Sequence, residues 1–192
     1  MQRKTWIIAV AIVVLGGAVA GGLYWRWVNS PRYALQQAAL ALQARDMDKF
    51  FNYLDLKAIL SNLVETCGKD LATSADQPAD EWNKLCRQLG RRFANVLLPK
   101  LFETFEAQIR VVVERYLVNL DYSKILVIAA AATVAQIDTQ GDGAVVTLTD
   151  PKTRDTFQFH MRRQPDQGTW QIVSVNYDDL KRFTKREFLD KT

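Results

Sequence analysis

The 192-residue sequence predicts an α+β protein: one N-terminal transmembrane helix, then a helical half followed by a four-stranded antiparallel sheet. Three observations support this fold class. Residues 6–27 form one apolar run, residues 30–116 repeat apolar side chains every three or four positions, and from residue 133 apolar and polar residues alternate between turn sequences. Spacings of three and four are typical of amphipathic helices, whereas alternation is typical of strands with one buried face.

The apolar run from Trp6 to Trp27 predicts a membrane anchor. No charged residue lies between Thr5 and Trp25, which matches the roughly 20 apolar residues that a helix needs to cross a bilayer core. Basic residues precede the run and aromatic residues flank both ends, as at membrane interfaces: Arg3, Lys4, Trp6, Tyr24, Trp25 and Trp27. We therefore assign residues 1–28 to a transmembrane anchor with a short cytoplasmic start.

Two features of the run leave alternatives open. Ala18-Val19-Ala20 matches the cleavage pattern of a secretory signal, and cleavage there would release a soluble mature protein. Gly17 and Gly21 form a GxxxG pair, which lets two anchors pack closely as a homodimer. Anchor and signal both export residues 29–192, and the basic start favours an N-inside orientation.

The exported part is nearly neutral. The whole chain has 25 basic and 21 acidic residues, a net charge of +4, but Arg3, Lys4 and Arg26 belong to the flanks of the anchor. Without these three, 22 basic residues face 21 acidic ones, which leaves a net charge of +1. Nucleic-acid binders concentrate positive charge on one face, so no nucleic-acid partner is predicted.

Cys67 and Cys86 are the only cysteines, and in an exported domain such a pair can form a disulfide. The residues between them have a loop-like composition, and closing that loop would remove about 3 kcal/mol of chain entropy from the unfolded state. Two unpaired thiols are the alternative. A metal site is not predicted, because two thiols 19 positions apart and a single distant histidine do not make a zinc site.

Cap residues divide the mainly helical part, residues 29–130, into separate helices. Ser30 is a good N-cap, and Pro31 suits the first position of the helix that follows the anchor. Asp46 predicts the start of a short second helix, and Asp55 predicts the start of a third.

Three further segments complete the helical part. Trp82–Leu97 is the clearest amphipathic helix, and Pro99 ends or kinks it. The next helix is expected to turn one stripe inward: Leu101, Phe102, Phe105, Ile109, Val112, Val113 and Tyr116. Residues 125–134 are apolar throughout but too short for a second span, so they predict a buried helix that runs into a strand.

Residues 131–178 predict an antiparallel meander, and residues 179–192 a mixed-charge tail. Turn sequences separate four short runs rich in β-branched and aromatic residues, near 133–138, 143–149, 155–163 and 169–177. In the third run apolar and polar side chains alternate clearly: Phe157, Phe159 and Met161 against Gln158, His160 and Arg162.

His160 is the only histidine and therefore the one side chain with acid–base chemistry near neutral pH. It lies on the polar face of a predicted strand beside Gln158, so it either sits on a solvated sheet face or lines a pocket closed by the helices. Trp170 is a further candidate for lining such a pocket. No serine or cysteine has the setting of a nucleophile, and no catalytic, cofactor-binding or metal-binding set is predicted.

Residues after the anchor resemble a known family. Ser30-Pro31-Arg32-Tyr33-Ala34-Leu35, then Ala38, Ala41, Asp46, Phe50 and Tyr53-Leu54-Asp55-Leu56, follow directly on the N-terminal span. This order resembles the bacterial membrane-anchored family called domain of unknown function 2939, and the likeness covers about Ser30–Val64. It implies a single-pass protein of the bacterial inner membrane with its C-terminal domain in the periplasm or outside, and it supplies no catalytic residues.

A second resemblance is architectural. Helices followed by a sheet that ends in Gly168-Thr169-Trp170-Gln171-Ile172-Val173-Ser174-Val175 are similar to the nuclear-transport-factor-2-like cone fold, whose last strand often carries Trp-x-Ile/Val. Exported single-span members of that fold commonly serve as assembly or ligand-binding modules. The helical part here, from Ser30 to about Ala130, is much longer than that of a minimal cone domain.

The combined prediction is a non-enzymatic exported domain that binds a protein partner or a small apolar ligand at the cell envelope, without a cofactor. Two alternatives remain. One is a cone-fold enzyme whose pocket is lined by the sheet face that carries His160 and Gln158. The other is a cleaved, secreted binding protein.

Overall fold

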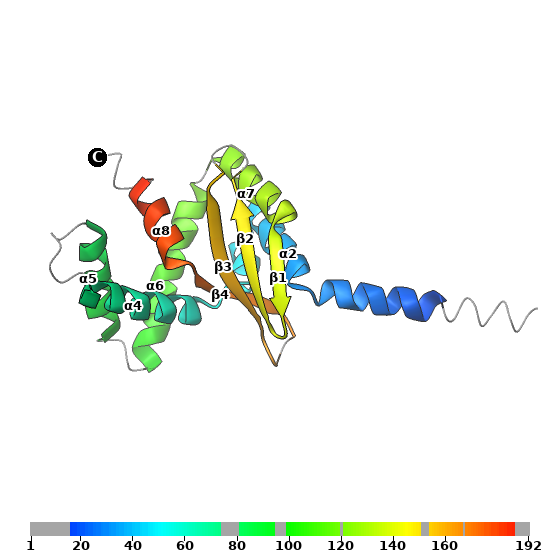
Figure 1. The fold of residues 1–192 in the computed structure, drawn as a ribbon, viewed down its shortest axis with the longest axis horizontal. Coiled ribbons are helices and arrows are strands. Elements are labelled where there is room, and N and C mark those ends of the chain that lie inside the picture. Colours follow the sequence, from blue (N-terminus) through cyan, green and yellow to red (C-terminus); the bar gives the residue numbers. More distant parts are fainter. Residues whose placement is uncertain are drawn as a thin grey trace, which may run out of the picture.

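The computed structural model describes residues 16–73, 81–94, 99–119, 121–150, 154–166 and 168–186. A helical half precedes a four-stranded antiparallel sheet, which confirms the predicted α+β class (Figure 1). The elements in chain order are α2 (Pro31–Gln43), α3 (Met47–Phe51), α4 (Leu56–Thr73), α5 (Glu81–Ala94), α6 (Pro99–Val118), α7 (Tyr122–Val134), β1 (Gln136–Gln140), β2 (Gly143–Thr149), β3 (Thr156–Arg163), β4 (Trp170–Val175) and α8 (Tyr177–Thr184).

Residues 16–28 form a helix that projects away from the other described elements and leads into α2 (Figure 1). Its aromatic side chains are exposed, Trp25 to 67% and Trp27 to 48%, and the space around Gly17 and Gly21 is open. Trp6 and the rest of residues 1–15 lie outside the described residues. Within the described ranges, no single helix has both the length and the apolar character of a membrane span. The anchor stays a prediction.

The three predicted N-caps are confirmed. The side chains of Ser30, Asp46 and Asp55 each accept a hydrogen bond from the backbone N–H three residues later, at 2.9–3.2 Å. These bonds satisfy donors that the first turn of a helix leaves without a backbone partner. Pro31 occupies the first turn of α2, as predicted.

Two predictions about the middle helices are wrong. The composition after Cys67 predicts a loop, but α4 continues to Thr73 and packs beside α5; residues 74–80 lie outside the described residues. Val112 and Tyr116 were expected to point inward, but 63% and 43% of their surfaces are exposed. In this part of α6 only a narrow stripe packs inward: Val113 and Leu117 contact the cluster formed by α2, α3, α4 and α7.

The helix at residues 125–134 runs into a strand as predicted, but only one of its faces is buried. Ile125, Ala129 and Ala132 are covered, whereas 54% of Val127 and 74% of Val134 is exposed. The reason is geometric, because a helix that packs on one side of a sheet presents its other side outward. Residues 133–134 complete this helix, so the first strand begins at Gln136 rather than at residue 133.

The sheet is the predicted meander, with strand order β1-β2-β3-β4 and antiparallel neighbours. The other edge of β4 is partly covered: Asp55 N–H donates to the Ile172 carbonyl and Ile172 N–H donates to the Tyr53 carbonyl, both at 2.9 Å. Gly141 lies in the β1–β2 turn with φ of 60°, a conformation that favours glycine.

The largest core lies between one face of the sheet and the helices α2 and α7, which cover that face (Figure 1). Its buried members come from all of these elements except β1: Ala34, Leu35, Ala132, Ala135, Ala144, Val146, Phe159, Met161 and Trp170. A second cluster joins α2, α3, α4 and α7, and a third lies around Cys67 and Cys86.

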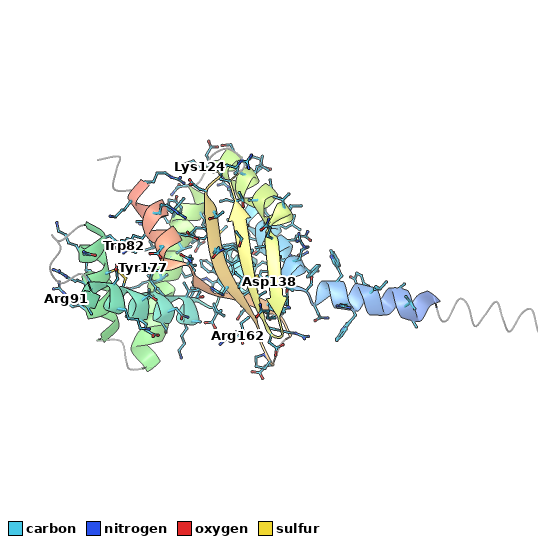
Figure 2. The ribbon with its side chains drawn as sticks, viewed as in Figure 1. Trp82, Arg91, Lys124, Asp138, Arg162 and Tyr177 are labelled. Atoms are coloured by element: carbon cyan, nitrogen blue, oxygen red, sulfur yellow. A yellow bond between two sulfur atoms is a disulfide. The ribbon has the colours of Figure 1, made fainter. Side chains whose placement is uncertain are left out.

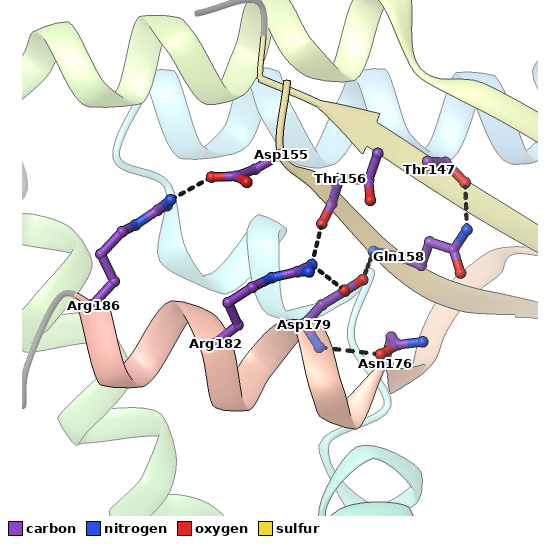
Figure 3. Close-up of polar contacts among 8 residues, drawn as sticks. All are labelled: Thr147, Asp155, Thr156, Gln158, Asn176, Asp179, Arg182 and Arg186. Atoms are coloured by element: carbon purple, nitrogen blue, oxygen red, sulfur yellow. Dashed lines mark hydrogen bonds and ion pairs between the residues drawn. The ribbon is translucent and has the colours of Figure 1, made fainter. Parts of the chain in front are cut away.

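The start of the predicted tail is the helix α8, which docks on β3 through polar contacts (Figure 3). Asn176 caps the helix by accepting from Asp179 N–H at 3.1 Å, and Asp179 accepts from Gln158 N–H at 2.8 Å. Arg182 bridges Asp179 and the Thr156 carbonyl, at 2.5 and 3.1 Å. Residues 187–192 lie outside the described chain.

Candidate functional site

His160 is exposed on the side of the sheet away from the core. Its cross-strand neighbours are Val145 on β2 and, one strand further, Asp138 on β1. These residues line an open depression of about 490 Å³. Gln158 shares this face, and its Nε2 donates to Thr147 Oγ1 at 3.3 Å.

Trp170 lies on the opposite face of the sheet. It is only 4% exposed and packs in the core between the sheet and α2, and its Nε1 donates to the Asn29 carbonyl at 2.8 Å. The structure therefore brings His160 and Gln158 together on one face and separates both from Trp170. In the described part of the chain, no group of three metal-ligating side chains comes together.

Cys67 and Cys86 are joined in a disulfide between α4 and α5, with 5.4 Å between their Cα atoms, so the predicted pairing is confirmed. Both residues are buried, and Trp82 packs against them. The disulfide lies next to a polar cluster that the sequence pattern does not reveal. Tyr177, at the start of α8, reaches this cluster from the far end of the chain (Figure 2).

The Tyr177 hydroxyl connects three helices. It accepts a hydrogen bond from Trp82 Nε1 of α5 and donates one to Asp70 Oδ2 of α4, both at 2.6 Å. Lys181 Nζ, one turn further along α8, lies 3.0 Å from the same carboxylate oxygen. The partners Asp70 and Tyr177 are 107 positions apart, and no sequence pattern links residues at that distance.

The electrostatics of this cluster fit a structural role. Burial, followed by the hydrogen bond to Asp70, raises the pKa of Tyr177 to about 12. The hydrogen bond from Tyr177, followed by that from Lys181, lowers the pKa of Asp70. At neutral pH the hydroxyl is therefore a protonated donor and the carboxylate its charged acceptor. A tyrosine that stays protonated acts as neither a base nor a nucleophile at neutral pH. We therefore interpret the cluster of Tyr177, Trp82, Asp70 and Lys181 as a structural link that holds α8 on α4 and α5.

A candidate binding site is the open groove between α2 and α7, whose middle is lined by aliphatic side chains. Its lining residues recur at the same spacing on both helices, which places each set of four on one helical face. The groove has a volume of about 530 Å³. It is lined by Gln36, Ala39, Leu40, Gln43, Leu126, Ala129, Ala130 and Thr133.

The groove is uncharged, with polar side chains at both ends: Gln36 and Thr133 at one end and Gln43 at the other. None of its eight side chains is charged; alanines line the middle, and Leu40 and Leu126 are 51% and 44% exposed. An exposed helix face normally carries polar side chains. Aliphatic side chains held open to solvent beside a concave surface are typical of sites that bind an apolar partner or ligand.

Exposed aliphatic side chains continue beyond the groove along α7. Val127 and Val134 lie next to the groove residues on the outer face of the helix, and no charged residue follows Lys124 in α7. Ala107–Val118 and Tyr122–Val134 together meet the length and composition of a broken membrane span, with a bend of 106° between them. In the sequence this apolar stretch predicts a buried helix, and so it gives no sign of the groove.

Comparison of the chain with protein-family models, with curated proteins and with solved structures finds no match. The two resemblances drawn from the sequence therefore stay untested. A proposal about function has to rest on the groove, the disulfide and the sequence of the anchor.

Proposed function

We propose that this chain is a single-pass protein of the bacterial inner membrane whose exported, non-enzymatic domain binds an apolar ligand or an apolar partner segment in the α2–α7 groove. The groove carries the proposal, because its eight uncharged side chains form a concave surface with two half-exposed leucines. Its volume of about 530 Å³ lies within the 300–1,000 Å³ typical of small-molecule sites.

The Cys67–Cys86 disulfide supports export, since disulfides persist mainly in oxidising compartments such as the bacterial periplasm. The apolar run from Trp6 to Trp27 supports anchoring. No specific observation favours the enzyme alternative: His160 is exposed on an open sheet face, and Tyr177 is held in its protonated form.

Cell fractionation tests the location. The full chain, with a C-terminal tag, is expressed in a bacterial host, and masses are compared with and without reduction and alkylation. We expect the full-length mass in the membrane fraction, with both cysteines alkylated only after reduction. A soluble product that begins at Gly21 would show a secreted protein instead, and a membrane protein with freely alkylated thiols would contradict export.

Native mass spectrometry of the purified full chain tests the groove. We expect a retained apolar ligand or partner segment on the wild type, and we expect its loss in Leu126→Asp, because a charge in an apolar groove costs desolvation free energy. Thr139→Asp is the control, since Thr139 is exposed on β1 and lies outside the groove lining. Equal occupancy in the wild type and in Leu126→Asp, or an empty wild type, would contradict the proposal.

A further inference from the structure

We propose that the occupant of the α2–α7 groove is an acyl chain of a phospholipid, which enters from the bilayer that holds the anchor. This inference rests on the proposed function and names the ligand class of the same site. Its physical basis is where the groove lies relative to the end of the anchor, together with the side chains that continue its surface.

One end of the groove is fixed beside the start of α2. Arg32 donates from Nη1 to the Thr133 carbonyl and from Nη2 to the Ala135 carbonyl, both at 3.0 Å. These bonds tie the last turn of α7 to the first turn of α2. Only Asn29 and Ser30 separate α2 from the helix of residues 16–28, so this end of the groove lies where the predicted anchor leaves the membrane.

The side chains change in kind along the groove. The end nearest the anchor is formed by Gln36 and Thr133, which can donate and accept hydrogen bonds. Ala39, Leu40 and Ala130 then form an apolar middle. Gln43 lies at the far end, so the apolar stretch is the middle of the groove. This middle suits part of an acyl chain, while the headgroup stays at the membrane surface beside Gln36 and Thr133.

The dimensions fit a portion of an acyl chain. Gln36 and Gln43, at opposite ends of the lining on α2, are seven residues apart, and a helix rises 1.5 Å per residue, so the groove is about 10 Å long. The absence of charge on its lining matches a ligand portion that itself carries none.

Exposed aliphatic side chains on α7 favour contact between this side of the domain and the bilayer. Val134, 74% exposed, sits at the anchor end of α7, and Val127 continues the same face. Burying aliphatic surface in a membrane interface is favourable. Contact with the membrane therefore covers side chains that would otherwise face water and brings the groove to its source of lipid.

Photo-crosslinking of the full chain in phosphatidylcholine–phosphatidylglycerol nanodiscs tests the inference. The photoreactive residue p-benzoylphenylalanine replaces Leu40 in the groove, Leu23 in the helix of residues 16–28, or Thr139 on the exposed strand β1. After illumination, intact-mass measurement identifies what is bound. We expect a phospholipid adduct at Leu40 and Leu23 and none at Thr139; a reporter at Gln43 checks the result if the Leu40 variant fails to fold.

A blocked groove supplies the matched comparison. Ala130→Trp fills the apolar middle and should lower the phospholipid adduct at Leu40 about tenfold, whereas Thr139→Trp, on the exposed strand β1 outside the lining, should leave it unchanged. The adduct at Leu23 should be the same in all variants, because it reports on the anchor alone.

The outcomes separate this inference from the function on which it rests. Phospholipid at Leu23 but not at Leu40 would overturn the acyl-chain inference and leave the anchored binding protein standing. An adduct of another protein, or of a second copy of this chain, at Leu40 would also overturn it. Absence of lipid at both positions would show that the proposed anchor is wrong.

Discussion

Tyr177 links α8 to two other helices, α4 and α5. Its hydroxyl donates to Asp70 and accepts from Trp82, so one side chain satisfies polar groups on two other helices. The Trp82 and Tyr177 rings also meet edge to face, with centroids 5.6 Å apart. A buried polar group that loses its hydrogen-bond partner costs its full desolvation free energy. This hydroxyl therefore contributes more to the free energy of unfolding than a hydroxyl on the surface.

Replacement of Tyr177 by phenylalanine should destabilise the protein by about 1–3 kcal/mol, because Trp82 Nε1 loses its acceptor and Asp70 loses a donor. Thermal unfolding of the purified full chain, followed by near-ultraviolet circular dichroism, measures the change. Tyr122→Phe is the control, since that tyrosine is 56% exposed at the start of α7. Equal melting temperatures for both variants would show that the cluster contributes nothing.

The same cluster predicts how stability depends on pH. The pKa of Tyr177 is raised to about 12, so its contribution is complete below the unfolded-state pKa near 10 and is lost as the pH rises toward 12. The pKa of Asp70 is lowered, so its contribution is complete above the unfolded-state pKa near 4 and is lost as the pH falls through the folded-state value.

Urea unfolding at a series of pH values checks both directions. The difference in unfolding free energy between the wild type and Tyr177→Phe should shrink between about pH 10 and pH 12. The difference between the wild type and Asp70→Asn should shrink below about pH 4. Differences that stay constant over these intervals would contradict the assigned protonation states.

At the scale of elements, α7 has two faces of similar composition but different surroundings. Ile125 is fully buried beneath α2, α3 and α4, whereas Val127, two positions later, is 54% exposed. Composition does not mark the exposed face, because Leu126, Val127 and Ile128 lie on it while the buried residues are also aliphatic. Packing against the sheet decides which face is core and leaves the other for the groove.

Ile125→Ala should cost about 2–5 kcal/mol, since it removes buried methyl groups and leaves a cavity. Val127→Ala, on the exposed side of the same helix, should change the unfolding free energy by less than about 0.5 kcal/mol. Denaturant midpoints of the two variants measure the contrast. Similar losses at both positions would mean that the outer face of α7 is also covered.

The disulfide acts on a pair of elements, because it ties α4 to α5 beneath the Tyr177 cluster. Removing both thiols with Cys67→Ala and Cys86→Ala should lower stability by about 3 kcal/mol, through the greater freedom of the unfolded chain. A reductant should lower the melting temperature of the wild type and leave that of the double variant unchanged. A wild type insensitive to reductant would show that the bridge does not form.

For the whole molecule, the described elements form two regions of different character. Next to the helix of residues 16–28 lie α2, α7 and the sheet, which hold the groove, while α4, α5 and α8 form the disulfide-linked region at the other end (Figure 1). The proposed ligand site is therefore near the helix of residues 16–28, and the Tyr177 cluster is far from that helix. We expect Tyr177→Phe to leave groove occupancy unchanged, as native mass spectrometry would show; a loss would mean that the two regions are coupled.

The order and type of most elements could be predicted from the sequence. Ser30, Asp46 and Asp55 mark helix starts by local hydrogen bonding, and the alternation around Phe159 marks a strand by its period of two. The continuation of α4 through Thr73 could not be predicted in this way, because its support comes from α5. Most of the candidate site could not be predicted, because the residues of α7 that line the groove have the apolar composition of a buried helix.

The sequence by itself determined the apolar run of Trp6–Trp27, the helix caps and the presence of one cysteine pair. It also determined the meander, because alternation with a period of two is visible along the chain. Only the tertiary structure decided that Trp170 and His160 lie on opposite faces, that Tyr177 closes over Asp70, and that α2 and α7 leave a groove between them. Each of these depends on residues about ten to more than a hundred positions apart, which no local spacing connects.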